Sequence, residues 1–229
     1  MKSDAFQFRQ FTVSQHLCGM KVGTDGVLLG AWAQGGSRIL DVGTGTGLIA
    51  LMMAQRYGDA HVSAIDIEQD AVCQASANVA ASPFPDRIAV VHASLQDFCR
   101  QAEQEGRYDA IVSNPPFFMD SLLPDDARRL SARHTVTLTY AELMACARKL
   151  LAADGELSVV VPFNYRQQMD NEAVFSGFFP CRVCGVKTSA AKPPKRYLLS
   201  YRLRPCSLSV EELTVGDECY SALTQAFYL

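Results

Sequence analysis

An apolar run that ends in a glycine-rich turn and continues as a helix constrains the fold of this chain most. Residues 37–42 read as a short buried strand, and residues 48–54 read as a helix. Gly43, Gly45 and Gly47 lie between them in a G-x-G-x-G pattern. A strand, a glycine-rich turn and a helix in this order begin a nucleotide-binding α/β unit, whose ligand lies at the carboxyl edge of the sheet.

Asp41, just before the turn, bears on the kind of ligand. A dinucleotide fingerprint needs G-x-G-x-x-G so that a pyrophosphate can lie on the helix N-terminus, and Leu48 stands where the third glycine should be. The acid also disfavours a diphosphate and favours a cation. S-adenosylmethionine carries an ammonium and a sulfonium group, so this turn predicts it as the cofactor. An NAD-dependent oxidoreductase is disfavoured, and no Tyr-x-x-x-Lys pattern supports one.

Two further strands end in polar residues. Residues 61–65 end in Asp66, which is placed to accept both hydroxyls of an adenosine ribose, although capping the next helix is an alternative role. Residues 88–92 lead to Ser94, where adenine would normally be recognised.

The loop Asn114-Pro115-Pro116-Phe117 closes an apolar strand over residues 108–113. The prolines remove two backbone donors, so carbonyl groups there lack local partners. Asn114 adds a side-chain carbonyl, and Phe117 offers a flat face. Such a loop suits a planar group that bears an NH2, which a nucleobase or a glutamine amide provides. An ordinary proline loop is the alternative.

Residues 1–34 precede the glycine-rich unit, and residues 6–13 alternate like a strand. Thr24 and Asp25 either cap a helix over residues 27–32 or belong to a segment that folds over the cofactor. We expect a single domain in which residues 1–34 cover the cofactor and residues 35–229 form the catalytic body.

The remaining pattern alternates helices and strands. Helices are expected over residues 70–81, 95–104, 139–152 and 165–175, and strands over residues 156–161, 182–187 and 197–203. Such alternation predicts a mostly parallel sheet with helices on both faces, here with seven strands and a final antiparallel hairpin. Residues 221–229 are expected to pack back on the body.

The charge of the chain is uneven. The 229 residues carry a net charge of −3, which excludes a generically basic nucleic-acid coat. Residues 187–204 nevertheless contain no acid and these cations: Lys187, Lys192, Lys195, Arg196, Arg202 and Arg204. With Tyr197 and Tyr201 interleaved, the segment predicts a polyanion contact, and a solvated edge strand is the alternative. Arg128, Arg129 and Arg133 form a second basic cluster.

The eight cysteines lack the spacing of a metal framework, so we predict no metal and reduced thiols. The N-terminus lacks a signal-peptide core, and no apolar run approaches membrane-spanning length. We therefore expect a cytoplasmic monomer without a membrane partner.

These features resemble the class I S-adenosylmethionine-dependent methyltransferases, which have a Rossmann-like fold. The Asn-Pro-Pro-Phe loop narrows the resemblance to the branch that methylates amino groups. Residues 10–13, 20–33 and 222–229 are similar to the family of bacterial valine-tRNA N6-adenine methyltransferases, so nearly the whole chain is covered. The resemblance implies methyl transfer from S-adenosylmethionine to the N6 of an adenine in the anticodon loop of valine tRNA.

The resemblance also implies roles for individual residues. Asp41 and the three glycines would hold the methionine part, and Asp66 the ribose. Lys21, Thr24 and Asp25 would close over the cofactor. The family has an acid that accepts from the cofactor adenine where this chain has Ser94, so either Ser94 or Asp97 would make that contact.

At the substrate, Asn114 and the Pro115 carbonyl would accept the amine hydrogens, with Pro116 stiffening the loop and Phe117 stacking on the base. The resemblance assigns the phosphate contacts to the two basic clusters. Guanine N2 in ribosomal RNA and a protein glutamine are alternative substrates of the same fold, and an inactive RNA-binding module is the alternative without catalysis.

Overall fold

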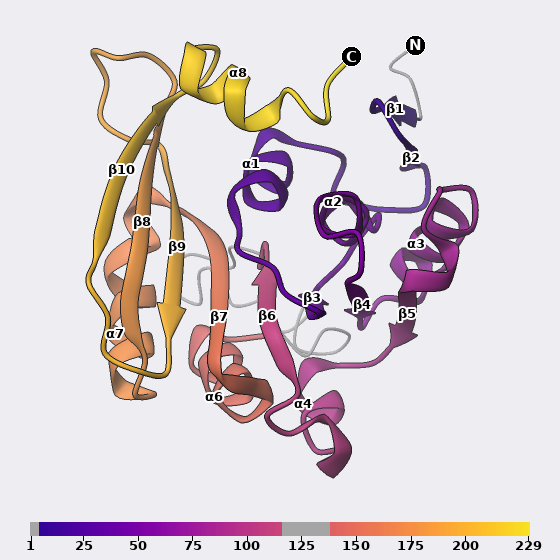
Figure 1. Ribbon diagram of the computed structural model, residues 1–229, viewed down its shortest axis with the longest axis horizontal. Coiled ribbons are helices and arrows are strands. Elements are labelled where there is room, and N and C mark those ends of the chain that lie inside the picture. Colours follow the sequence, from indigo (N-terminus) through magenta and orange to yellow (C-terminus); the bar gives the residue numbers. More distant parts are fainter. Residues whose placement is uncertain (1–4, 116–137) are drawn as a thin grey trace, which may run out of the picture.

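The computed structural model describes residues 5–115 and 138–229, and its main sheet runs through the middle of the molecule (Figure 1). The strand order in the described part is β10-β8-β9-β7-β6-β3-β4-β5. Neighbouring strands are parallel except that β9 runs antiparallel to both β7 and β8. The strands are β3 (Arg38–Val42), β4 (His61–Asp66), β5 (Ile88–His92), β6 (Tyr108–Ser113), β7 (Leu151–Pro162), β8 (Phe179–Lys187), β9 (Arg196–Arg202) and β10 (Ser209–Thr214).

The sheet confirms the predicted Rossmann-like α/β fold. Strands β3 to β9 are the seven expected strands, and β8 with β9 forms the antiparallel hairpin. β10 adds an eighth strand at the edge, parallel to β8, which the sequence did not indicate. In β10 only Leu213 is buried, so its sequence lacks the apolar pattern of an internal strand.

Helices cover both faces of the sheet, as predicted (Figure 1). Apolar side chains of α1, α2 and α3 pack on one face, whereas those of α4, α6 and α7 pack on the other. The helices are α1 (Thr24–Trp32), α2 (Leu48–Arg56), α3 (Gln69–Ala80), α4 (Leu95–Phe98), α6 (Tyr140–Leu150), α7 (Arg166–Phe175) and α8 (Glu218–Thr224). Successive residues of a strand alternate between the two layers, so both faces of the sheet are buried.

Two predicted helices differ in extent from the structure. The helix expected over residues 95–104 is α4 followed by a separate 3-10 turn, Ala102–Gln104. The helix expected over residues 139–152 ends at Leu150, because the chain enters β7 at Leu151. Its start is marked by a capping box between Thr139 and Glu142.

The N-terminal strand expected over residues 6–13 is instead a hairpin of β1 (Ala5–Gln7) and β2 (Thr12–Ser14). A bond from Phe8 N to Phe11 O closes the turn, and both rings are buried. The C-terminal tail packs back on the body, as predicted, because Phe227 is buried and Gln55 of α2 donates to Ala226 O at 2.8 Å. It also contacts this hairpin, since Arg9 N donates to Phe227 O at 2.9 Å.

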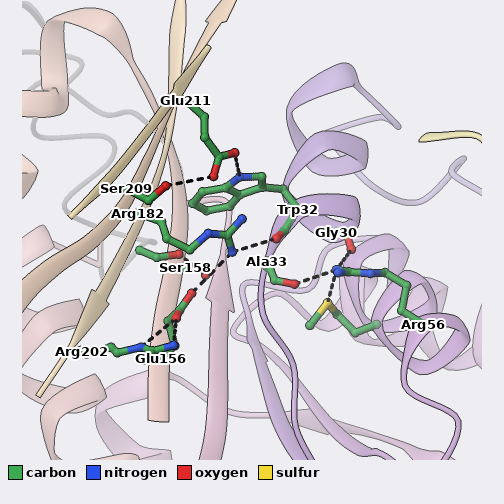
Figure 2. Close-up of polar contacts among 12 residues, drawn as sticks. Gly30, Trp32, Ala33, Arg56, Glu156, Ser158, Arg182, Arg202, Ser209 and Glu211 are labelled. Carbon is green, nitrogen blue, oxygen red and sulfur yellow. Dashed lines mark hydrogen bonds and ion pairs between the residues drawn. The ribbon is translucent and has the colours of Figure 1, made fainter. Parts of the chain in front are cut away.

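Helix α1 lies inside the molecule, between α2, α8 and the sheet (Figure 1). Arg56 of α2 donates to the carbonyls of Gly30 and Ala33, which are among the acceptors left open at the end of α1. Figure 2 shows the Arg182 side chain beside the Trp32 ring. The Arg182 guanidinium lies 4.0 Å from the centroid of that ring. Arg56 thus joins α1 to α2, and Arg182 joins it to the antiparallel edge of the sheet.

None of the helices in the described part of the chain has the length and apolarity needed to cross a membrane.

Candidate active site

The strand register brings the predicted site residues to one edge of the sheet. Val42 of β3 is level with Ser113 of β6 and with Ile65 of β4. Gly43, Asn114 and Asp66 are the next residues of these three neighbouring strands, so they lie side by side. This is the carboxyl edge of the parallel strands, where α/β proteins bind their ligands.

The glycine-rich turn is held in place from two sides. Its amides at Gly43 and Thr44 both donate to Ile65 O, and the Gly45 amide donates to Asp66 Oδ2 at 2.8 Å. Gly43 and Gly45 have φ values of 68° and 56°, in the left-handed region, and a Cβ at either position would meet nothing within 4 Å. The turn is therefore tight and fixed, with open space beside it.

Asp41 lies beneath the turn and is fully buried. Its Oδ2 accepts hydrogen bonds from Thr44 Oγ1 at 2.6 Å and from Ala50 N at 3.1 Å. Its Oδ1 is buried and has no hydrogen-bond partner in the described part of the chain. Burial is the main cause that raises the pKa of this carboxyl to about 7. A buried acceptor without a donor fits a cationic group, and the ammonium of S-adenosylmethionine is one.

We expect Asp41→Asn to separate stability from cofactor affinity. The pKa of Asp41 rises from 3.8 to about 7 on folding, so its contribution to stability is present at low pH and is lost as the pH rises through 7. The variant should therefore unfold at a higher temperature than the cofactor-free wild type at pH 8, with little difference at pH 4. Its amide would repel a bound ammonium, so S-adenosylmethionine should bind about tenfold or more weakly. Thermal unfolding and calorimetric titration measure the two effects, and unchanged cofactor affinity would contradict this role of Asp41.

Asp66 takes part in the turn as well as being placed for the ribose. Its Oδ1 accepts from Glu68 N at 3.0 Å, but the N-cap of α3 is Glu68 and lacks a side-chain capping bond, so Asp66 does not cap that helix. Its Oδ2 is bonded to Gly45 N, which ties the end of β4 to the turn. Because a carboxylate has further lone pairs, ribose binding by Asp66 stays a prediction that this geometry permits.

Ser94 and Asp97, the two candidates for the cofactor adenine, are bonded to each other. Ser94 is the N-cap of α4: its Oγ accepts from Asp97 N at 3.0 Å and donates to Asp97 Oδ2 at 2.8 Å. Arg100 binds the other carboxylate oxygen at 2.6 Å. The adenine of the cofactor would therefore contact the hydrogen-bonded pair of Ser94 hydroxyl and Asp97 carboxylate, and not one of these residues alone.

Two buried amides of α3, which the sequence analysis missed, hold the N-terminal segment over the turn. Asn78 Oδ1 accepts from Ser14 N, and Asn78 Nδ2 donates to the carbonyls of Ser14 and Thr46. Gln74 Oε1 accepts from Leu17 N at 3.1 Å. Asn78 thereby joins the segment to the glycine-rich turn itself. The only signal in the sequence is a pair of amides, i and i+4, on the buried face of a helix.

The other predicted residues of the cofactor cover differ in their environment. Lys21 and Thr24 are exposed, and the N-cap of α1 is Gly23, with no side-chain capping bond from Thr24 or Asp25. Asp25 forms a 2.6 Å ion pair with Arg196 at the start of β9. Asp25, which we predicted to cover the cofactor, is therefore ion-paired with Arg196, which we predicted to contact RNA.

Asn114 lies where the cover meets the end of β6. Its Nδ2 is 3.7 Å from the sulfur of Met20, which belongs to the cover, and its Oδ1 is buried without a hydrogen-bond partner in the described residues. The strand beneath is fixed by a bond from Ser113 Oγ to Val42 O. Pro115 is buried beside it, whereas Pro116 and Phe117 lie outside the described residues. The described part of the loop thus offers an unused amide acceptor next to the glycine-rich turn.

Carboxylates from other elements neutralise much of the predicted basic surface. Lys187 pairs with Glu212, and Arg202 donates two hydrogen bonds to Oε2 of the buried Glu156. Arg204 forms a single 2.7 Å ion pair with Asp154, and both side chains are exposed. Tyr201 is fully buried and donates to Asp170, so the expectation that it interleaves with a polyanion surface is wrong.

Among the described residues, Lys192 and Lys195 are the members of the basic segment that form no ion pair. Both lie in the loop between β8 and β9 and are exposed. Arg128, Arg129 and Arg133, the second basic cluster, lie outside the described residues.

Residues 22–179 match the family model described as the methyltransferase small domain. A tRNA1(Val) (adenine(37)-N6)-methyltransferase of Parabacteroides distasonis is 45% identical, over 100% of this chain and 99% of the relative. A protein of the same name from Phocaeicola vulgatus is 44% identical, again over 100% of this chain and 99% of the relative.

Among solved structures, a predicted O-methyltransferase of Agrobacterium tumefaciens has a TM-score of 0.70 at 17% identity. The match covers 89% of this chain and 96% of that one, and it supports the fold alone.

The fold and the site define an S-adenosylmethionine-dependent methyltransferase, which confirms the predicted enzyme class and methyl donor. The chain belongs to the methyltransferase small domain family and, over its whole length, to the group of these two curated relatives.

Proposed function

We propose that this protein transfers the methyl group of S-adenosylmethionine to the N6 of adenine 37 in valine tRNA. The observation that carries the proposal is the position of Asn114. Its buried, unused Oδ1 lies at the strand end beside the glycine-rich turn, where a fixed acceptor can receive an amine hydrogen. The names of the full-length relatives supply the tRNA and the position in it.

The chemical problem for an exocyclic amine is that its lone pair is delocalised into the ring. Asn114 Oδ1 and the Pro115 carbonyl would accept the two amine hydrogens and localise the lone pair on nitrogen. Bound S-adenosylmethionine supplies the electrophilic methyl group. No strong general base is needed, because the proton can leave after transfer. The rate enhancement would come from positioning the reactants and from preorganised dipoles.

The remaining assignments belong to the same proposal. Asp41 would hold the cofactor ammonium, Asp66 its ribose, and the Ser94–Asp97 pair its adenine. Residues 1–34, which include Lys21 and Thr24, would cover the cofactor. Phe117 would stack on the target base after it leaves its loop. The enzyme would act as a monomer in the cytoplasm, where its tRNA is found.

Methyl transfer from labelled S-adenosylmethionine to an unmodified valine tRNA transcript tests this proposal. N6-methyladenosine should appear after nucleoside digestion, and a matched transcript with guanosine at position 37 should take up no label. Label on both transcripts would place the reaction at another nucleotide. No label on either, with the cofactor bound, would direct the search to ribosomal RNA and protein glutamine and would overturn the assignment.

A further inference from the structure

A groove beside the predicted active site combines an exposed aromatic ring with unpaired cations. It has a volume of about 540 Å³ and lies between the end of β7 and the loop that joins β8 to β9. Phe163 and Asn164 line one side, and Lys192, Pro194 and Lys195 line the other. A hydrogen bond from Phe163 N to Lys195 O, 3.1 Å long, joins the two sides.

The Phe163 ring is held in place yet remains half exposed. It stacks on Tyr197 with 6.0 Å between ring centroids and an interplanar angle of 29°. The guanidinium of Arg166 lies 4.4 Å from the centroid of Tyr197. Half of the Phe163 surface, 50%, is still accessible. A supported ring with an open side can stack on another planar group with little loss of side-chain entropy.

The charges around the ring favour a phosphate. Lys192 and Lys195 form no ion pair with any residue in the described ranges, unlike Arg196, which Asp25 neutralises. Asn164 adds a side-chain donor and acceptor that suit the edge of a base. Phosphate, base edge and base plane are the three parts of a nucleotide that single-stranded RNA binders contact.

The groove lies close to Asn114 without coinciding with it. Ser113 of β6 is level with Val159 of β7, so Phe163 stands three residues beyond the level of Asn114. Three residues of extended chain span about 10 Å, and neighbouring strands are about 4.8 Å apart. A second hollow of about 260 Å³ shares Lys195 and Arg196 with the groove and reaches Thr24 and Asp25 of the cofactor cover. A nucleotide near the target, rather than the target itself, would reach Phe163.

We propose that this groove binds a nucleotide that flanks the target adenine, with its base stacked on Phe163 and its phosphate at Lys192 and Lys195. The inference rests on the proposed function, since it requires an RNA substrate. It assigns to Phe163 and Asn164 a role that their places in the sequence do not indicate.

The test is the affinity for a fluorescent anticodon stem-loop of valine tRNA, measured without cofactor at several salt concentrations. Phe163→Leu keeps an apolar side chain but removes the aromatic plane. It should weaken binding about tenfold, with an unchanged salt dependence. Phe163→Trp should restore affinity. Phe175→Leu is the matched control, because that phenylalanine is 87% exposed at the far end of α7.

Replacing both lysines, Lys192→Gln with Lys195→Gln, should act differently from the change at Phe163. Removal of the contact with this one phosphate should reduce the slope of log K against log salt by about 0.7. The inference is overturned, and the proposed function is kept, if the wild type methylates the tRNA but Phe163→Leu binds the stem-loop with wild-type affinity. An equal loss of affinity in Phe175→Leu would overturn it in the same way. If the wild type neither binds nor methylates it, the proposed function fails, and the inference fails with it.

Discussion

Asn114→Ala should lower kcat for methyl transfer about 10²- to 10³-fold while leaving the fold and the cofactor affinity intact. The side-chain carbonyl is a fixed dipole that accepts an amine hydrogen as charge develops on nitrogen, and loss of one such group costs about this much in other enzymes. Stability should not fall, because Asn114 Oδ1 accepts no hydrogen bond from the described residues. Single-turnover methyl transfer, thermal unfolding and calorimetric cofactor titration measure the three quantities.

A matched amide elsewhere provides the control for this variant. Asn171 is exposed on α7. Within the described residues, its side chain forms a hydrogen bond with Gln167 and with no other side chain. Asn171→Ala should keep wild-type activity. Asn114→Ala with kcat within a factor of about three of wild type would exclude the amide from the reaction and leave the loop as a structural turn.

Glu156→Ala should destabilise the protein by about 3 kcal/mol, the largest loss that we expect from a single residue outside the apolar core. The Glu156 side chain is 2% exposed, and Arg202 donates two hydrogen bonds to it at 2.9 and 3.0 Å. Arg182, which stacks on Trp32, lies 3.9 Å from the other carboxylate oxygen (Figure 2). Without the acid, two partly buried guanidinium groups would lose their counter-charge. Urea unfolding measures the change.

An exposed pair at the same end of the hairpin serves as the control. Asp154, like Glu156, is an acid of β7, and Arg204 lies two residues after Arg202, yet these side chains are 82% and 64% exposed. Asp154→Asn should change the free energy of unfolding by less than about 0.5 kcal/mol, since solvent screens such pairs. If the two variants lose equal free energy of unfolding, the burial of Glu156 is not the reason that its ion pair stabilises the protein.

The same measurements bear on the predicted RNA role of Arg202. If Glu156 holds this guanidinium for structural reasons, Arg202→Ala should lower stability and leave the salt dependence of tRNA binding unchanged. If Arg202 instead contacts phosphate, Arg202→Ala should leave stability unchanged and reduce the salt dependence of tRNA binding.

The chain order of Asp41, Asp66 and Asn114 explains why their convergence could be predicted. Each residue lies within one position of the end of an apolar strand, and the strands alternate with helices. Parallel strands joined by helical crossovers bring their carboxyl ends to one edge, so local pattern and topology suffice. The edge strand β10 was missed for the converse reason, since it carries little of the apolar pattern that marks a strand.

Ion pairing could not be predicted in the same way. Residues 187–204 contain cations and no acid, so the sequence indicated a free basic surface. Their partners come from distant segments: Asp25 for Arg196, Glu156 for Arg202 and Glu212 for Lys187. Which acid meets which cation depends on β9 lying between β7 and β8 and on α1 lying against the hairpin.

The sequence by itself therefore determined the α/β class, the glycine-rich turn and the three polar residues at its edge, because these follow from periodicity and local chemistry. Only the tertiary structure decided that the Asp41 carboxylate keeps an unused oxygen, that Asn78 holds the cover over the turn, and that Lys192 and Lys195 alone in their segment are unpaired among the described residues. Burial and charge neutralisation arise from segments that meet in space. The local sequence does not indicate which distant side chain will be the neighbour.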